Sequence, residues 1–284
     1  NAVGLAVHAW CCVFPEGEDP KILRAAQILV DEAIAHPIRT FELAGRTFDD
    51  RPYQLGVINL SRDSTYRESI AHDVPAALYR ARRMTVEGAV MIDIGAESTG
   101  TNADIVDVDA QLASLLPVLD ALLAEGLLVS VETYLTDVAV AALEAGAQVI
   151  NLTGRVDDPT LYEAIGRHNA GLILCYTPGQ TARSGDDVPP VDAMIDEQMA
   201  FFRDRLDLVT GCGVDKLWID PGFGFDMARL SVMVAEPMPA RDQAEWVPVS
   251  RPDRAQNYKD RTRSDAKSVP TFADRVLVRI GIGG

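Results

Sequence analysis

Short apolar segments alternate with amphipathic segments along most of the chain after about residue 55. The amphipathic segments place apolar residues at helical spacing, whereas the apolar segments have the length of strands. The pattern predicts eight strands, at residues 55–60, 89–94, 127–133, 148–152, 171–176, 216–220, 245–250 and 275–282. Strands that alternate with helices favour an α/β fold, here a TIM (β/α)8 barrel whose parallel strands close into a ring.

The first 54 residues follow a different pattern. Residues 21–36 are amphipathic and predict a helix, and "RTFELAGRTFDDRPYQ" (39–54) predicts a β-hairpin with Ala44 and Gly45 in its turn. We therefore expect an N-terminal helix and hairpin extension over residues 1–54 and the barrel over residues 55–284. Residues 225–284 are rich in arginine and only weakly periodic, so the pattern says least about their layout.

Composition and charge narrow the function classes. The 284 residues are 48% hydrophobic and 24% charged, as in ordinary globular proteins, and the net charge of −16 argues against binding to nucleic acid. No apolar run has the length of a membrane span, and the N-terminus lacks the basic start of an export signal. The four cysteines show no metal-ligand spacing, which predicts reduced thiols in a cytoplasmic protein.

Polar residues stand where the predicted strands end. They are Asn59, Asp93, Glu132, Asn151 and Asp220. Each alone could cap a helix, but in a barrel all five would meet at the carboxyl-terminal face, where barrel enzymes have their active sites. Carboxylates and carboxamides around one pocket suit a flat heterocycle with both N–H donors and acceptors.

Four segments carry a family resemblance. "GVINLSRDS", "MIDIGAEST", "VSVETYLTDVAVAALEAGAQVIN" and "LWIDPGFGF" resemble, in order and approximate spacing, the motifs of dihydropteroate synthases. The resemblance implies a pterin-binding TIM barrel in folate biosynthesis. Such a transferase joins a pterin methyl diphosphate to p-aminobenzoate and releases pyrophosphate, usually with Mg²⁺. Family members usually form homodimers.

The resemblance also implies roles for individual residues. Asp93, Glu132, Asn151 and Asp220 would line the pterin pocket, with Asp93 and Asp220 also among the catalytic residues. Asn59 would sit at the Mg²⁺ and diphosphate end as a catalytic and metal-binding residue.

The remaining implied residues belong to the diphosphate and aminobenzoate end. Ser98 and Thr99 would approach the diphosphate and p-aminobenzoate, and Ser250 would reach the aminobenzoate carboxylate. In a divergent synthase, Arg251 and Arg279 would bind the anion together with Arg62, which stands where the family usually has Pro, and Arg251 would also be catalytic.

The chain departs from the family pattern mainly at this anion end. Gly100 stands where the family has Arg, Pro252 where it has Lys, and the final His is missing; Leu152 replaces an Asp and Glu132 replaces a shorter Asp. Three hypotheses stay open: a divergent dihydropteroate synthase of weak activity, a pterin- or folate-binding methyltransferase of the same barrel superfamily, and a catalytically silent pterin-binding homologue.

Overall fold

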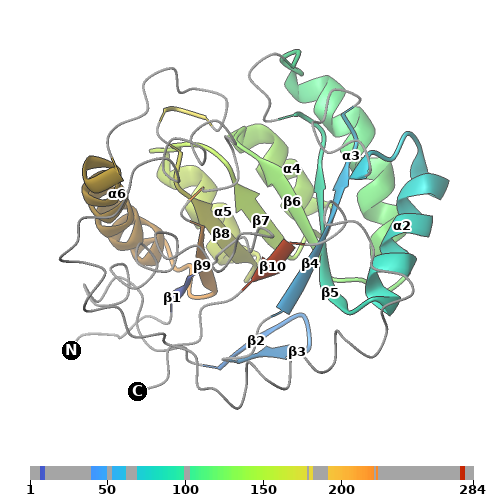
Figure 1. Cartoon of the computed structure of the whole chain (residues 1–284), viewed down its shortest axis with the longest axis horizontal. Helices are drawn as coiled ribbons and strands as arrows, with labels where there is room; N and C mark the ends of the chain where they lie inside the picture. The colour runs from blue at the N-terminus through green and yellow to red at the C-terminus, as the bar shows by residue number, and fades with distance from the viewer. Residues whose placement is uncertain are drawn as a thin grey trace, which may run out of the picture.

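The computed structural model describes residues 7–9, 40–49, 53–61, 69–98, 103–177, 179–181, 191–220, 222 and 276–278. Its centre is an eight-stranded sheet in the order β1-β9-β8-β7-β6-β5-β4-β10. The strands are β1 (Val7–Ala9), β4 (Tyr53–Asn59), β5 (Ala89–Gly95), β6 (Val129–Thr133), β7 (Val149–Leu152), β8 (Gly171–Cys175), β9 (Leu217–Asp220) and β10 (Val276–Val278). The sheet is curled, with helices packed on its outer side (Figure 1).

Strands β4 to β9 are parallel and neighbours in chain order, which confirms the first six predicted strands. The two edges differ from the prediction. β1, from the segment assigned to the extension, pairs parallel with β9, and β10 pairs antiparallel with β4. The prediction of a parallel strand at 275–282 was wrong in direction, because the weakly periodic tail offers no clear crossover helix to impose it. The predicted strand 245–250 and helix 21–36 lie outside the described residues.

Five helices connect or follow the parallel strands and confirm the predicted alternation. They are α2 (Val74–Val86), α3 (Val108–Ala124), α4 (Thr136–Glu144), α5 (Pro159–Arg167) and α6 (Val191–Gly211). Three of them begin at an aspartate whose side chain accepts a backbone N–H of the first turn, as good N-caps do: Asp73, Asp107 and Asp158. No helix in this part of the chain combines the length and the apolar character needed to cross a membrane.

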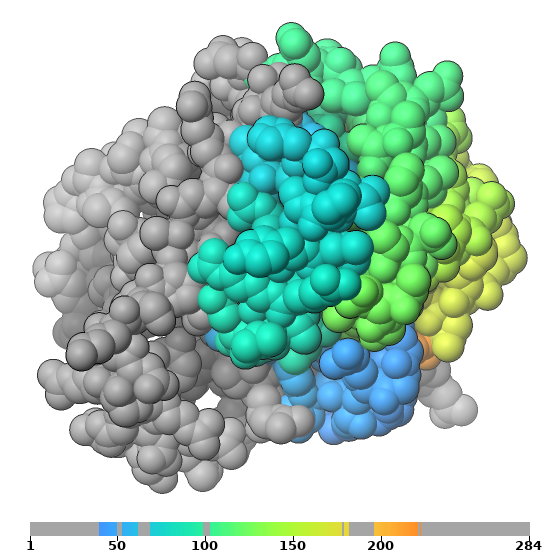
Figure 2. All heavy atoms as spheres, turned by 90° about the vertical axis from the view of Figure 1, so that its right-hand side faces the viewer, coloured from blue at the N-terminus to red at the C-terminus, as the bar shows by residue number. Residues whose placement is uncertain are grey.

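Alternate residues of each strand point outward into one apolar core shared with the helices. Ile92 and Ile94 of β5 and Val129 and Val131 of β6 are buried there, as is Leu152. Figure 2 shows α2, α3 and α4 side by side on the outer surface of the molecule. The outward-facing strand residues and the apolar faces of the helices are buried against each other. This packing holds in place the strand ends that carry the polar residues.

A second apolar cluster closes the amino-terminal end of the sheet. β2 (Phe41–Leu43) and β3 (Arg46–Phe48) pair antiparallel, with Leu43 opposite Arg46. We call the buried set at this end the apolar floor; it consists of Leu43, Phe48, Leu55, Met91, Leu128, Val149, Ile173 and Trp218. The Trp218 ring meets Phe41 and Phe48 edge-on, with centroids 5.1 and 5.5 Å apart.

Candidate active site

The polar strand-end residues lie on the inner face of the sheet, beyond the apolar floor. Asn59, Gly95, Glu132 and Asn151 are register partners across β4, β5, β6 and β7. Register partners in parallel strands point to the same face, and neighbouring strands are about 4.8 Å apart. The structure thus brings three predicted site residues and one glycine into a single line, which we call the polar row.

Asp93, which is buried, and Asn151, which is partly buried, form a pair on this face. Asn151 Nδ2 donates to Asp93 Oδ2 over 3.0 Å. Neither Asp93 Oδ1 nor Asn151 Oδ1 has a hydrogen-bond partner within the described residues, although both atoms are buried. Burial raises the pKa of Asp93 to about 6, against the opposing effect of Ser130 and Asn151. Two buried acceptors without donors are costly unless a ligand supplies them.

Glu132 is held by a residue that the motif pattern did not single out. The Thr153 hydroxyl donates to Glu132 Oε1 in a short hydrogen bond. Burial raises the pKa of Glu132 to about 8, and the charges of Asp93 and Glu97 act in the same direction. The hydrogen bond from Thr153 opposes part of this rise. Glu132 is therefore mostly protonated at neutral pH and offers an O–H donor, in contrast to Asp93. Thr153 lies two residues after Asn151, so strand alternation was the signal that could have identified it.

Gly95 explains how the longer side chain of Glu132 fits. A Cβ built on Gly95 would lie 2.5 Å from Glu132 Oε2. The carboxyl group of Glu132 therefore occupies the space beside β5 that a side chain at position 95 would need. The extra methylene, relative to Asp, is accommodated by this glycine.

Asp220 ends β9, opposite Cys175 of β8. Its Oδ1 accepts the backbone N–H of Gly222 over 2.8 Å. Burial raises the pKa of Asp220, while hydrogen bonds from Gly222 and Cys175 oppose the rise. The Gly222 hydrogen bond fixes the carboxylate at the strand end.

Asn59 stands at the other end of the polar row. Its Nδ2 donates to Ser69 Oγ over 2.6 Å, which leaves Oδ1 as the atom that could bind a metal ion. The chain beyond Asn59 is also tied back, because Ala71 N donates to the Asn59 carbonyl over 2.8 Å.

The loop after β5 contains a second residue that the motif pattern left without a role. Glu97 is buried and accepts hydrogen bonds from Gln111 Nε2 (2.9 Å), Tyr134 OH (2.9 Å) and Val106 N (3.2 Å). These bonds join the β5 loop to α3 and to the β6 loop. The adjacent Ser98, a predicted site residue, is buried in this anchored loop.

The structure does not place every predicted residue. Thr99, Arg62, Ser250, Arg251 and Arg279 lie outside the described residues. Among the residues that the structure describes, no three His, Cys, Asp or Glu side chains are grouped as a metal site would require. The pterin-pocket candidates are thus brought together, whereas the predicted anion site stays a prediction.

Comparison with known proteins identifies the family of the chain. The sequence profile of the family "Pterin binding enzyme" matches residues 55–234. A dihydropteroate synthase of Synechocystis is 31% identical over 188 residues, which cover 64% of this chain and 65% of that protein, just under two thirds of its length.

Solved structures of dihydropteroate synthases share the fold. The Yersinia pestis enzyme with a sulfonamide drug complex has a TM-score of 0.61 at 29% identity, covering 69% of this chain and 74% of that one. The Thermus thermophilus enzyme in complex with 4-aminobenzoate has a TM-score of 0.53 at 33% identity, covering 66% and 67%.

Proposed function

Because the chain belongs to the family of pterin-binding enzymes, we propose that it is a dihydropteroate synthase of folate biosynthesis. The reaction joins a pterin methyl diphosphate to p-aminobenzoate and releases pyrophosphate. The activity of the whole enzyme is proposed from relatives, and the chain spans just under two thirds of the length of the Synechocystis relative.

The observation that carries the proposal is the pair of acceptors at Asp93 and Asn151. Asp93 Oδ1 and Asn151 Oδ1 are buried side-chain atoms of one hydrogen-bonded pair, and both lack a donor within the described residues. A pterin ring presents ring N–H and amino donors along one edge, which matches two neighbouring acceptors. Glu132, protonated at neutral pH, supplies the complementary donor for a ring acceptor.

The reaction divides between the two ends of the site. At the methylene carbon the bond to the diphosphate oxygen breaks, and its electron pair leaves with pyrophosphate. The amine nitrogen of p-aminobenzoate then forms the new C–N bond and loses a proton. In this proposal Asp93, Asn151 and Asp220 hold the ring so that the methylene carbon faces the incoming amine.

Charge on the leaving group must be stabilised at the other end. Asn59 is suited to Mg²⁺, since its Oδ1 is an oxygen ligand and Mg²⁺ commonly uses one or two protein oxygens together with substrate phosphates. When bound, Mg²⁺ would neutralise part of the diphosphate charge. We assign Arg62, Arg251 and Arg279 to the anion, and Ser98, Thr99 and Ser250 to the diphosphate and aminobenzoate. With Gly100 and Pro252 in place of charged residues, the proposed activity is weak.

The proposal extends to the fold and the setting. We infer that the six parallel strands belong to a barrel of the TIM type, as the family match supports. Residues 1–54 are not wholly an extension to this barrel, because β1 lies in the same sheet beside β9. We infer a reducing, cytoplasmic setting from the four cysteines, whose spacing in the sequence fits neither a metal site nor a disulfide framework. A homodimer stays a prediction.

Two measurements test this function. Calorimetry with a pterin monophosphate should give binding that Asp220→Ala abolishes, whereas Asp120→Ala, on the exposed surface of α3, should bind like the wild type. A coupled pyrophosphate assay should show slow, Mg²⁺-dependent dihydropteroate formation that Arg251→Ala lowers further. Pterin binding with methyl transfer from a methylated folate, and no synthase turnover, would favour the methyltransferase; binding with neither activity would favour a silent homologue.

A further inference from the structure

The chain turns sharply just after the site residues of β7. Thr153 N donates to the Thr133 carbonyl, and Arg155 N donates to the Gln180 carbonyl over 2.8 Å. Between them, Gly154 forms an isolated antiparallel bridge with Thr181. The end of β7 is therefore held between the loops that follow β6 and β8.

This turn leaves no room for a side chain at position 154. A Cβ on Gly154 would lie 2.6 Å from Tyr134 Cβ and 3.1 Å from the Gln180 carbonyl oxygen. Close packing on both sides means that a shift of either neighbouring loop is transmitted to the turn. What fixes the β8 loop therefore also fixes Thr153.

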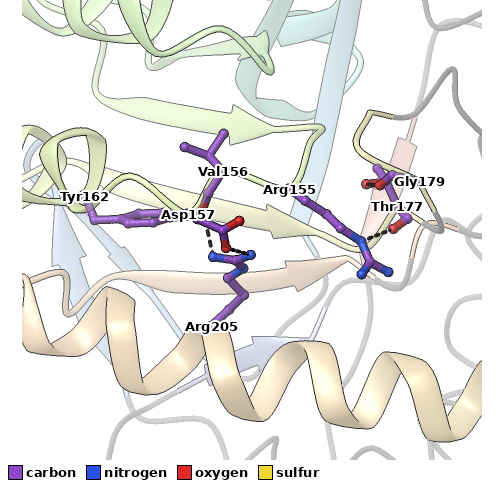
Figure 3. A network of polar contacts seen from close by, with 7 residues as sticks. All are labelled: Arg155, Val156, Asp157, Tyr162, Thr177, Gly179 and Arg205. Atoms are coloured by element: carbon purple, nitrogen blue, oxygen red, sulfur yellow. Dashed lines mark hydrogen bonds and ion pairs between the residues drawn. The ribbon is translucent and has the colours of Figure 1, made fainter.

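The Arg155 side chain makes the connection to the β8 loop and to α6. Its Nε donates to the Thr177 carbonyl over 2.8 Å, as Figure 3 shows, and its Nη2 pairs with Glu197 over 2.7 Å. The guanidinium also lies over the rings of Tyr176 and Phe201, 5.4 and 5.3 Å from their centroids. Because only 23% of the Arg155 side chain is exposed, these interactions are screened less than those of a surface ion pair.

We infer that Arg155 is a positioning residue for the candidate active site: it fixes the end of β7 and so sets the places of Asn151 and Thr153. Thr153 donates to Glu132, and Asn151 donates to Asp93. Through these two bonds Arg155 acts on both acids without touching the ligand. The effect on ligand binding rests on the proposed pterin function.

Arg205 provides a matched control on α6, the helix that also carries Glu197. It donates to the Val156 carbonyl over 2.9 Å, pairs with Asp157 and lies over the Phe201 ring, 5.7 Å from its centroid. Figure 3 shows Arg205 reaching from α6 to Val156 and Asp157 in the loop after β7, whereas Arg155, in that same loop, reaches Thr177 after β8. The contacts of Arg205 lie further along the loop, towards α5, so it contributes to the same packing without holding Thr153.

The test compares Arg155→Gln with Arg205→Gln, using Thr153→Val as the benchmark. The titration of the Glu132 carboxyl carbon is followed by NMR in the ligand-free protein, with Asp93 and Glu97 as the neighbouring acids. Since the Thr153 hydrogen bond lowers the pKa of Glu132, Thr153→Val should raise the titration midpoint. Arg155→Gln should raise it as well, and should weaken binding of a pterin monophosphate about tenfold.

Arg205→Gln should lower the thermal midpoint of unfolding but leave the Glu132 titration and the affinity at their wild-type values. An unchanged Glu132 midpoint in Arg155→Gln, or an equal shift in both variants, would overturn the inference. If Arg155→Gln does not fold, Glu197→Gln removes the same ion pair from the α6 side and is judged by the same criteria. Failure of the wild type to bind the pterin would reject the proposed function, while the ligand-free titration would still decide the role of Arg155.

Discussion

The two ends of the same sheet face are built for different purposes. At the amino-terminal end, Met91, Val149 and Trp218 pack in the apolar floor. Two residues further along the same strands stand Asp93, Asn151 and Asp220. The floor lowers the free energy of the folded state through buried apolar area, whereas the polar end keeps buried acceptors without donors. The contrast shows that one strand can carry both a stabilising apolar residue and a binding residue. Two positions apart, they point to the same face of the sheet but lie nearer its amino-terminal and its carboxyl-terminal end respectively.

The largest expected effect is on the floor. Trp218→Ala removes a ring that packs against Phe41 and Phe48 and should lower the free energy of unfolding by about 3 to 5 kcal/mol, the usual cost of a buried aromatic truncation. Urea denaturation measures this loss. Tyr79→Ala, at a side chain that is 69% exposed, is the control and should change stability little. A loss below about 1 kcal/mol for Trp218→Ala would contradict the assignment of the floor as the stabilising end.

Substitution at the polar end should raise the free energy of unfolding, whereas substitution in the floor lowers it. Asp93→Asn removes a carboxyl group whose pKa burial raises to about 6, so at pH 8 the variant no longer carries the buried charge of position 93. We expect the free energy of unfolding to rise by about 1 to 3 kcal/mol. The amide introduced at position 93 would direct a donor at ligand donors, so pterin affinity should fall about 100-fold, or about 2.7 kcal/mol. Denaturation and calorimetry on one preparation measure both effects; a variant that loses stability as well as affinity would contradict the contrast.

The sequence predicted the strands and the strand-end acids because both depend on local pattern. The alternation around Ile92, Asp93 and Ile94 already separates an outer core face from an inner polar one. It did not predict that Thr153 would hold Glu132, or that Glu97 would join Gln111 and Tyr134. Those partners are distant in sequence, and their meeting depends on loop conformations that no periodicity encodes.

The two acids of the site should also differ in their pH response. Because burial raises the pKa of Glu132 to about 8, the folded state keeps a proton that the unfolded state loses near pH 4.5. Stability therefore falls as the pH rises between these values, by about 2 to 3 kcal/mol from pH 6 to pH 8. The glutamine in Glu132→Gln cannot ionise, so this variant should lack the fall in stability between pH 6 and pH 8 that Glu132 causes. Identical pH dependence in the two proteins would mean that Glu132 is ionised in the folded protein.

The smallest expected effect concerns the fit between Glu132 and Gly95. Gly95→Ala puts a methyl group within 2.5 Å of the present position of Glu132 Oε2. The carboxyl group must therefore shift, which disturbs its hydrogen bond with Thr153 and should weaken pterin monophosphate binding by roughly fivefold, about 1 kcal/mol. Glu132→Asp alone should keep or improve affinity, because the shorter side chain no longer has to fill the space beside β5.

In the double variant the two changes should compensate, since the shorter aspartate at position 132 would leave room for the methyl group at position 95. A double-mutant cycle in pterin affinity should therefore give a favourable coupling of about 1 kcal/mol. Gly211→Ala, at the last residue of α6 with no atom near its Cβ position, is the control for a general glycine effect on affinity and should show no coupling to Glu132. Additive effects of Gly95→Ala and Glu132→Asp would mean that the glycine does not accommodate the longer acid, and that the polar end was adjusted to Glu132 through another strand.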